Sequence, residues 1–379
     1  MPLPMDIDAE IYKASQNEWH VPMFNAQEWK ELCCRNKTEG DIHDGCTIII
    51  SAIQRYILNH KPPLPISRPS IKKMKKDFIT ILESSHLDHI KTDIDKELIR
   101  NKFDEKVNVD YILSAGSSTN GISNHFQCEN RYTCGHHKAK STAWAWANPM
   151  SKRTHSMFLF LFRPFANTSE HAIDIVTWRT MFRLSGYVAT QFKPMIAKTV
   201  YDGANAKSVI DISCGWGDRL AGFYTSKAKD YLGCDPNPIS YNLYKKQCIA
   251  YEEILNSPLF PTEYEFVDHG DWFEINGNKR VRIYNKPAED MNWSSIVGAY
   301  KYDLMFTSPP YFGIERYGED DDSTGQSWKR YNDYTLWRDH FFFPVMDAIN
   351  DVCNKTMINI VDPVVNNVRY PIEKDILGR

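Results

Sequence analysis

The stretch Thr307–Tyr311, TSPPY, carries the residue types with the most specific chemistry in this sequence. It follows the apolar residues Leu304–Phe306, which predict a strand, and its two prolines fix the backbone angle φ and cannot donate to a β-ladder. Such a rigid turn would hold a hydroxyl, carbonyl oxygens and an aromatic ring at the C-terminal edge of a sheet, where open α/β folds bind ligands. We therefore predict a site for a flat ring that bears an amino group. Its candidate catalytic residues are Ser308, Pro309, Pro310 and Tyr311.

A glycine-rich loop, DISCGWGD, lies between a predicted strand and a predicted helix at residues 211–218. Gly215 and Gly217 would let the backbone approach a ligand closely, because glycine has no Cβ and tolerates unusual backbone angles. Asp211, at the strand end, could accept a hydrogen bond from a polar cofactor group. Short Gly-x-Gly turns occur in many unrelated loops, so this loop indicates a cofactor site only in combination with the strand ends that follow it.

Carboxylates follow the next two predicted strands. Asp235 ends the first of them, where ribose hydroxyls would lie, and the stretch KPAED trails the second, where Glu289 or Asp290 could meet an adenine amino group. Singly, each acid could equally be a helix N-cap or a surface charge. The ordered set of three strand ends predicts a nucleoside-containing cofactor. A dinucleotide-binding dehydrogenase is disfavoured, because Leu220 stands where the G-x-G-x-x-G pattern needs its third glycine.

Alternating strands and helices must position these residues. Apolar runs predict strands at 208–213, 231–235, 281–285, 302–307 and 355–362, and helices at 192–201, 218–228, 238–255 and 335–353. This alternation predicts a mainly parallel sheet with helices on both faces. Upstream, apolar residues at three-and-four spacing predict helices at 25–35, 46–60 and 70–103, with the proline-rich stretch 61–70 as a stiff connector between helices. We predict three regions: a helical region 1–106, an aromatic and basic linker or recognition region 107–184, and an α/β domain 185–379.

The middle region mixes thiol, imidazole, aromatic and basic side chains. The spacing of its candidate metal ligands matches no paired-knuckle pattern, so we favour an absence of metal over a zinc site. These candidates are His125, Cys128, Cys134, His136 and His137. Other residues here are of the kind that hold phosphates and stack bases, although a solvated basic loop with buried tryptophans explains them equally well. They are Arg131, Tyr132, Lys138, Lys140, Trp144, Trp146, Lys152 and Arg153.

Composition sets wide bounds. With 379 residues, 42% of them hydrophobic, and a formal net charge of -3, the chain can build two ordinary domains and carries no global basic field. The longest apolar run, Met157–Phe162, is far too short to span a bilayer, and the N-terminus lacks a signal-peptide pattern. Nine cysteines without regular spacing indicate reduced thiols. We expect an intracellular protein with no membrane partner.

Together these motifs resemble those of the S-adenosylmethionine-dependent methyltransferases that modify exocyclic amino groups, above all the DNA amino-methyltransferases. DISCGWGD is similar to their glycine-rich cofactor motif, GCDPN to their ribose-binding acid and KPAED to their adenine-contacting stretch. TSPPY resembles the catalytic motif written (D/N/S)-PP-(Y/F/W), and FKPMIAKTVYDG resembles the helix that closes over the methionine part of the cofactor. The resemblance covers about residues 185–363.

The resemblance implies a Rossmann-like class I methyltransferase domain, preceded by the helical region, that methylates a DNA base. The base would be rotated out of a duplex or offered single-stranded, and serine rather than aspartate before the prolines slightly favours cytosine N4 over adenine N6. It also implies a role in restriction-modification and a cytoplasmic location in a bacterial, phage or viral host cell. The implied cofactor is S-adenosyl-L-methionine, bound by Lys193, Asp211, Ser213, Cys214, Gly215, Gly217, Asp235, Glu289, Asp290 and Thr307.

Two departures from the family pattern stand out. Ile212-Ser213 replaces the usual Pro-Phe, and the chain ends soon after Asn366, whereas the family's sheet continues past the fifth strand with a helix and an antiparallel hairpin. The N-terminal half or a partner chain would then complete the sheet, or the polypeptide is incomplete at its C-terminus.

Other functions stay open. The same turn would suit RNA or a protein amide as methyl acceptor, or the fold would serve as a catalytically idle binding subunit. A carbon-5 cytosine enzyme is disfavoured because the sequence has no Pro-Cys pair.

Overall fold

The computed structural model describes residues 6–36, 42–92, 111–166, 170–256, 262–318 and 325–378. The chain forms two compact units. The first, here called the helical unit, comprises residues 1–67, 131–189 and 315–321; the second, the sheet unit, comprises residues 68–130, 190–314 and 322–379. These units cut across the three regions 1–106, 107–184 and 185–379. The boundary between 67 and 68 falls inside the proline-rich stretch that we interpreted as a connector between helices.

Six helices and one short ribbon make up the described part of the helical unit. Its elements are α1 Ile7–Ala14, α2 Ala26–Arg35, α3 Ile42–His60, β3 Gly135–His136, α7 Thr142–Ala147, α8 Lys152–Phe165, α9 Ile175–Ser185 and β10 Glu315–Arg316. The predicted helices at 25–35 and 46–60 are thus present. A capping box starts α2, because Asn25 accepts from the backbone N–H of Glu28 while the Glu28 carboxylate accepts from the N–H of Asn25.

Aromatic side chains fill the core of the helical unit. Trp178 is fully buried, with its ring 5.0 Å from that of Phe162 and 5.8 Å from that of Trp146. Trp146 is itself 8% exposed, and its indole N–H donates to the carbonyl of Pro62 at 2.8 Å. This tryptophan therefore stabilises the core and presents no free face for base stacking, which agrees with the buried-tryptophan interpretation of the middle region.

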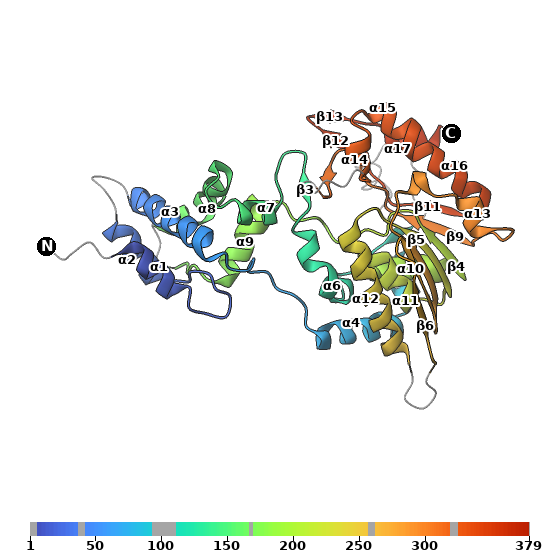
Figure 1. Ribbon diagram of the computed structural model, residues 1–379, viewed down its shortest axis with the longest axis horizontal. Helices are drawn as coiled ribbons and strands as arrows, with labels where there is room; N and C mark the ends of the chain where they lie inside the picture. The colour runs from blue at the N-terminus through green and yellow to red at the C-terminus, as the bar shows by residue number, and fades with distance from the viewer. Residues whose placement is uncertain are drawn as a thin grey trace. The chain divides into compact units, whose positions relative to one another are not determined.

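A seven-stranded sheet organises the sheet unit (Figure 1). Its strand order is β11-β9-β4-β5-β8-β7-β6, and the first five of these strands are parallel. The strands are β4 Ser208–Asp211, β5 Asp230–Cys234, β6 Glu265–Asp268, β7 Trp272–Asn276, β8 Arg280–Tyr284, β9 Leu304–Thr307 and β11 Thr356–Ile358. All five predicted strands are present: β4, β9 and β11 are shorter than predicted, and β5 and β8 begin and end one residue earlier. This confirms an α/β fold with a mainly parallel sheet.

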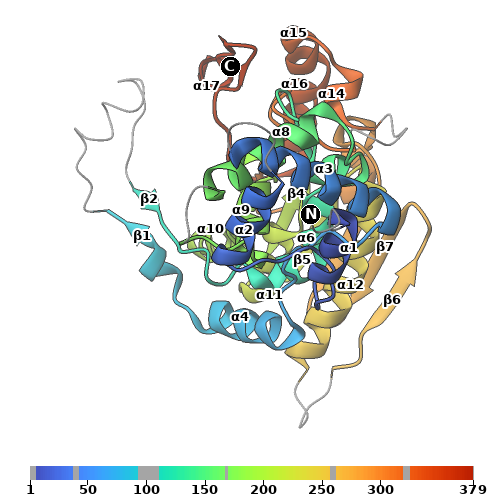
Figure 2. The same cartoon turned by 90° about the vertical axis from the view of Figure 1, so that its left-hand side faces the viewer.

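Two strands of this sheet are absent from the prediction. β7 pairs antiparallel with β8, and β6 pairs antiparallel with β7, so the sheet extends beyond β8 with β6 at its edge (Figure 2). As one alternative, we expected the N-terminal half to complete the sheet, but among the described residues no strand of that half joins it. The strands that join the five parallel ones come from residues 265–276.

The pleat of the strands separates two cores. Along β4, Val209 faces one cluster of buried residues and Ile210 faces the other, and Leu304 and Met305 divide in the same way on β9. Helices cover both faces (Figure 1). One face is covered by α4 Ile71–Glu83, α6 Gly121–Arg131, α10 Pro194–Gly203, α11 Asp218–Thr225 and α12 Pro238–Leu255. The other is covered by α13 Trp293–Val297, α15 Tyr334–Trp337, the π-helical turn η3 Arg338–Phe342, α16 Phe343–Val352 and α17 Ile372–Leu377.

The predicted helix at 70–103 is wrong beyond Glu83. Ser84 is extended, and the hydroxyl of Ser85 accepts from the N–H of Leu87 to start a short 3₁₀ turn, η1 His86–His89. Serine favours such caps because its hydroxyl competes with helical backbone hydrogen bonds. A two-stranded ribbon of β1 Ile90–Lys91 and β2 Ile112–Leu113 follows. The rest of the predicted helix, and the boundary at 106, lie outside the described residues.

The remaining short elements lie around the strand ends of the sheet unit. They are η2 Ala288–Asp290, α14 Ser327–Arg330 and the hairpin of β12 Val364–Val365 with β13 Val368–Arg369. Asn366 and Asn367 turn this hairpin with positive φ, a conformation that asparagine tolerates well. Within the described residues, no helix combines the length and the apolar character that crossing a bilayer requires.

Candidate active site

The candidate site lies where the direction of the sheet's strand order changes. From β4 the chain builds the sheet towards β5 and β8, and it then returns to the other side of β4 with β9 and β11. In open α/β sheets, the loops that leave the carboxyl ends of two such neighbouring strands diverge and form the ligand site. Here those loops are the glycine-rich loop after β4 and the SPPY turn after β9.

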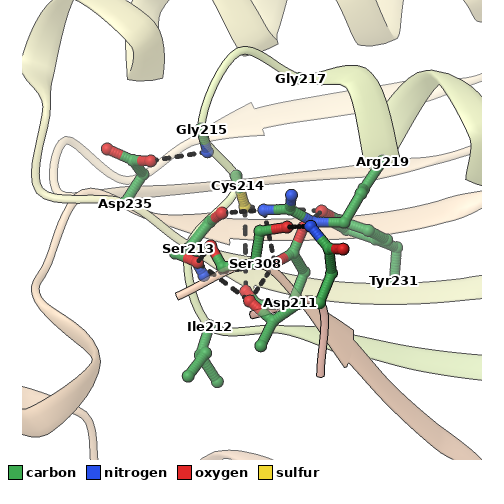
Figure 3. A network of polar contacts seen from close by, with 12 residues as sticks. Asp211, Ile212, Ser213, Cys214, Gly215, Gly217, Arg219, Tyr231, Asp235 and Ser308 are labelled. Atoms are coloured by element: carbon green, nitrogen blue, oxygen red, sulfur yellow. Dashed lines mark hydrogen bonds and ion pairs between the residues drawn. The ribbon is translucent and has the colours of Figure 1, made fainter. Parts of the chain in front are cut away.

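Ser213 joins these two loops directly (Figure 3). Its Oγ lies 2.9 Å from Oγ1 of Thr307 and donates to the carbonyl oxygen of Ser308 at 2.7 Å. Ser213, which we predicted only as a cofactor-binding residue, therefore has a structural role that the sequence did not reveal. The predicted cofactor loop and the predicted catalytic turn are parts of one hydrogen-bonded assembly.

Asp211 anchors that assembly from below and is fully buried (Figure 3). Its Oδ2 accepts from Nε of Arg219 and from the hydroxyl of Tyr231, each at 2.8 Å, and its Oδ1 accepts from Oγ1 of Thr307 at 3.0 Å. One carboxylate thus binds a helix and two neighbouring strands. In this structure its acceptors serve the protein, and the cofactor hydrogen bond that we predicted for Asp211 is not one that its buried oxygens offer.

The two partners of Asp211 with shifted pKa values, Arg219 and Tyr231, both stay protonated near neutral pH. Burial opposes the charged guanidinium of Arg219, yet the adjacent Asp211 carboxylate outweighs that effect and raises the pKa of Arg219. Burial also raises the pKa of Tyr231 far above its ordinary value, so its hydroxyl stays protonated and donates to Asp211. The pair is therefore a compensated buried ion pair with an extra neutral donor.

The two glycines of the loop both need positive φ, at 58° for Gly215 and 69° for Gly217. A Cβ on Gly217 would collide with the Gln247 side chain, because this residue begins α11 tightly against α12. A Cβ on Gly215 would meet nothing nearer than 3.7 Å. A Cβ would therefore fit at Gly215 in ordinary van der Waals contact with Ser213 and Arg219, whereas at Gly217 it would not fit. Cys214 points into the core, where burial raises the pKa of its thiol, so only its backbone could contact a ligand.

Asp235 ends β5 beside the loop (Figure 3). Its Oδ2 accepts from the N–H of Gly215 at 2.8 Å and from the hydroxyl of Tyr244 at 3.2 Å, and its Oδ1 accepts from the N–H of Asn237 at 2.9 Å. Burial raises the pKa of Asp235 to about 6, although these hydrogen bonds favour the charged form. Asp235 thus lies against the glycine-rich loop, and its role as a ribose-binding acid stays a prediction.

The predicted adenine acids are held by a segment that the sequence did not suggest. Arg330 of α14 donates to Oε1 of Glu289 at 2.9 Å and to Oδ2 of Asp290 at 2.6 Å, and the Tyr331 hydroxyl donates to Glu289 at 3.2 Å. A Cβ on Gly325 would meet Pro236 at 2.8 Å and Pro287 at 3.5 Å. The segment 325–331 therefore crosses the ends of β5 and β8.

The SPPY turn is held on two sides. Asn359, directly after β11, donates from Nδ2 to Oγ of Ser308 at 2.7 Å and to the hydroxyl of Tyr311 at 3.2 Å. Phe312 is 7% exposed and packs its ring against Tyr334 and other aromatic side chains. Hydrogen bonds therefore fix the polar groups of the turn, and aromatic packing fixes the residue that follows them.

Lys193, the last predicted cofactor residue, lies apart from this network. It precedes α10, is exposed and donates from Nζ to the carbonyl of Ala115 at 2.5 Å. The structure also adds residues that the sequence analysis missed: Arg219, Tyr231, Tyr244, Arg330 and Asn359. Asn359 alone had a visible signal, because it is a polar residue between the apolar residues Ile358 and Ile360 of a predicted strand.

The histidine and cysteine candidates fall into different units. His125 and Cys128 lie on α6 in the sheet unit, whereas Cys134, His136 and His137 belong to the helical unit. Nδ1 of His125 lies 2.5 Å from the carbonyl of Pro69, and burial lowers the pKa of His136. Among the residues that the structure describes, no group of three or more His, Cys, Asp or Glu side chains is placed to hold a metal ion.

No protein-family model matches the chain, and no curated protein or solved structure is significantly similar to it. The fold class therefore follows from the sheet itself: this is an α/β protein with a seven-stranded, mostly parallel sheet.

The buried pair of Asp211 and Arg219 predicts a large loss of stability when it is broken. Arg219→Met leaves the Asp211 carboxylate buried without its cation, and we expect the free energy of unfolding to fall by roughly 3–5 kcal/mol in urea denaturation. Arg280→Met is the control, because Arg280 pairs with Glu274 while 46% of its side chain stays exposed, and its loss should be about 0–1 kcal/mol. Equal losses in the two variants would contradict the anchoring role.

The loop glycines predict unequal effects of the same substitution. Gly217→Ala adds a collision with Gln247 to the strain of positive φ, and we expect a loss of about 2–4 kcal/mol. Gly215→Ala adds only the strain, about 1 kcal/mol. Thermal and urea denaturation would measure both, and a Gly215 variant as unstable as the Gly217 variant would show that the described packing is wrong.

Proposed function

We propose that this protein is an S-adenosylmethionine-dependent methyltransferase that methylates an exocyclic amino group of a DNA base, cytosine N4 ahead of adenine N6. The observation that carries the proposal is the contact of Ser213 with Thr307 and Ser308, at 2.9 Å and 2.7 Å. It brings a glycine-rich loop suited to a nucleoside cofactor against a turn suited to a planar amine. A methyl donor and its acceptor need that proximity.

The residues at the strand ends fit such a cofactor. Gly215 has no Cβ to keep a ligand away from its backbone, and the Asp235 carboxylate beside it suits ribose hydroxyls. Asp290 keeps 44% of its side chain exposed and is available to an adenine amino group once it shares its contacts with Arg330. When bound, S-adenosylmethionine supplies an electrophilic methyl group on a sulfonium.

The SPPY turn offers what an unreactive amine requires. The lone pair of a base amino group is delocalised into the ring, so the nitrogen is a poor nucleophile. Oγ of Ser308 and the carbonyl oxygen of Pro309 would accept hydrogen bonds from its two N–H groups, which favours a tetrahedral nitrogen with its lone pair directed at the methyl group. As the bond from nitrogen to the methyl carbon forms, the bond from that carbon to sulfur would break to leave a neutral thioether, and the nitrogen would release one proton to solvent. Alignment of the reacting atoms in this way can lower a barrier by about 7–11 kcal/mol, so no covalent enzyme intermediate is needed.

Tyr311 would complete the acceptor pocket. Its side chain is partly exposed and its hydroxyl is bonded to Asn359, and its aromatic ring is of the kind that stacks on a target base. A base in a duplex would have to be rotated out of the stack to reach this ring, whereas a single strand would offer it directly. We propose DNA as the partner for this reason and because the TSPPY motif resembles that of the DNA amino-methyltransferases.

The first test is methyl transfer by Ser308→Ala. Removing one acceptor of the amino hydrogens should lower kcat on the order of 100–1000-fold while the Kd for S-adenosylmethionine stays unchanged. Radiolabelled cofactor would be incubated with DNA, RNA and protein in separate reactions, and calorimetry would measure cofactor binding. Ser294→Ala, at an exposed position of α13, is the matched control. Unchanged turnover in the Ser308 variant would sink the proposal, and label in RNA or protein would replace DNA as the substrate.

The second test is the pH dependence of cofactor binding. Since burial raises the pKa of Asp235 to about 6, the carboxylate is ionised above that pH and neutral below it. An ionised Asp235 that accepts from the ribose should make the Kd for S-adenosylmethionine rise as the pH falls through about 6, approaching about tenfold for each further pH unit. In Asp235→Asn the Kd should be higher and should not vary with pH. Calorimetry across this range would decide, and a flat wild-type profile would exclude Asp235 from the cofactor site.

A further inference from the structure

Asn359 is the one polar side chain at the end of β11 that contacts both polar groups of the SPPY turn. Its backbone is fixed first, because its N–H donates to the carbonyl of Thr307 at 2.8 Å and continues the β9–β11 ladder. Its side chain then reaches Ser308 and Tyr311. A residue in this place is tied to the sheet at its backbone and to the candidate catalytic groups at its amide.

The hydrogen bonds around Asn359 fix which way its amide faces. The Tyr311 hydroxyl donates its hydrogen to the backbone carbonyl of Asn359 at 3.3 Å. The hydroxyl oxygen of Tyr311 can therefore only accept a hydrogen bond from the Asn359 side chain. The nearby amide atom must therefore be the donor Nδ2, which lies 3.2 Å from the Tyr311 hydroxyl and 2.7 Å from Oγ of Ser308. Both amide hydrogens are then in use.

This arrangement sets the direction of the Ser308 hydroxyl. A serine oxygen has two lone pairs and one hydrogen, and Asn359 occupies one of the lone pairs. Among the described residues, the Ser308 hydroxyl hydrogen has no acceptor. Ser308 therefore retains one free lone pair and one free hydrogen, and it can accept a hydrogen bond and donate another at the same time.

We propose that Asn359 is a specificity-determining residue that turns the Ser308 hydroxyl so that the site reads an amino group together with the ring nitrogen beside it. This inference rests on the proposed function. Its substrate is an amidine edge, N=C–NH₂, as in cytosine N3 and N4 or adenine N1 and N6. The free lone pair of Ser308 accepts from the amino group, and its free hydrogen donates to the ring nitrogen. An amine without that neighbouring acceptor leaves the hydrogen unpaired and reacts less well.

Asn359→Asp reverses the polarity of this contact with little change in shape. A carboxylate cannot donate, so the Ser308 hydroxyl donates to it and presents only lone pairs to the substrate. The variant should then lose its preference for a base that keeps the ring nitrogen. Asn354→Asp makes the same charge change near the opposite end of β11, at an exposed position with no side-chain contact to the turn, and is the matched control. Thermal denaturation would verify that all proteins are folded.

The experiment compares kcat/KM for single-stranded DNA that carries cytosine or 3-deazacytosine, with adenine and 1-deazaadenine as a second pair. Each deaza base keeps the amino group and lacks the ring nitrogen. For each protein we divide kcat/KM for the natural base by kcat/KM for its deaza analogue. This ratio should be about tenfold or more higher in the wild type and in Asn354→Asp than in Asn359→Asp. Differences in intrinsic reactivity between the bases cancel, because every protein meets the same two substrates.

The possible outcomes distinguish the role of Asn359 from the proposed methyltransferase activity. Methylation by the wild type with the same base ratio in Asn359→Asp and Asn354→Asp would overturn the role of Asn359 and leave the methyltransferase assignment standing. No methylation of either natural base by the wild type would overturn the proposed function, and the inference would fall with it. A ratio that collapses only in Asn359→Asp would support both.

Discussion

The buried carboxylate of Asp211 is the constraint on which the rest of the site depends. It lies at the end of the central strand, β4, and binds a guanidinium from α11, a hydroxyl from β5 and a hydroxyl from β9. An unpaired charge there would be costly, so the three partners must be present together for the fold to be stable. The stability of the sheet unit and the geometry of its ligand edge therefore depend on the same hydrogen bonds.

Further hydrogen bonds connect the surroundings of Asp211 to the candidate catalytic groups. Ser213 links the glycine-rich loop to the carbonyl of Ser308, and Asn359 links the hydroxyls of Ser308 and Tyr311 to the neighbouring strand. Phe312 then closes the turn against an aromatic cluster. The candidate reactive groups are thus held by atoms from the ends of β4 and β11, the two strands beside β9, which is the pre-organisation that a reaction governed by alignment requires.

Much of this architecture could be predicted from the sequence, because its signals are local. The five strands are short apolar runs, and α12 begins at Pro238 and ends at Leu255 as predicted, since a proline at the first turn and an asparagine cap are read directly from the chain. β6 and β7 were missed because β6 is half exposed and lacks a long apolar run. The helix after Glu83 failed because two serines cap better than they extend.

The site was harder to predict, because its decisive contacts are distant in sequence. The motifs locate Asp211, Asp235 and Ser308, and the structure brings all three to one edge of the sheet. No pattern announces that Arg219 turns back to neutralise Asp211, or that Arg330 reaches Glu289 and Asp290 from a segment beyond the SPPY turn. We predicted a ligand for Asp211 because the sequence shows only an acid at the end of a strand. The partners that bury this carboxylate lie on three other elements and are not visible in the sequence.

The most direct measurement is mass spectrometry of the nucleosides from unmethylated DNA that has been incubated with the protein and S-adenosylmethionine carrying a deuterated methyl group. The account predicts labelled N4-methylcytosine, or labelled N6-methyladenine, with the label attached to the exocyclic nitrogen. Label on carbon 5 of cytosine, or DNA nucleosides without label after prolonged incubation, would contradict it.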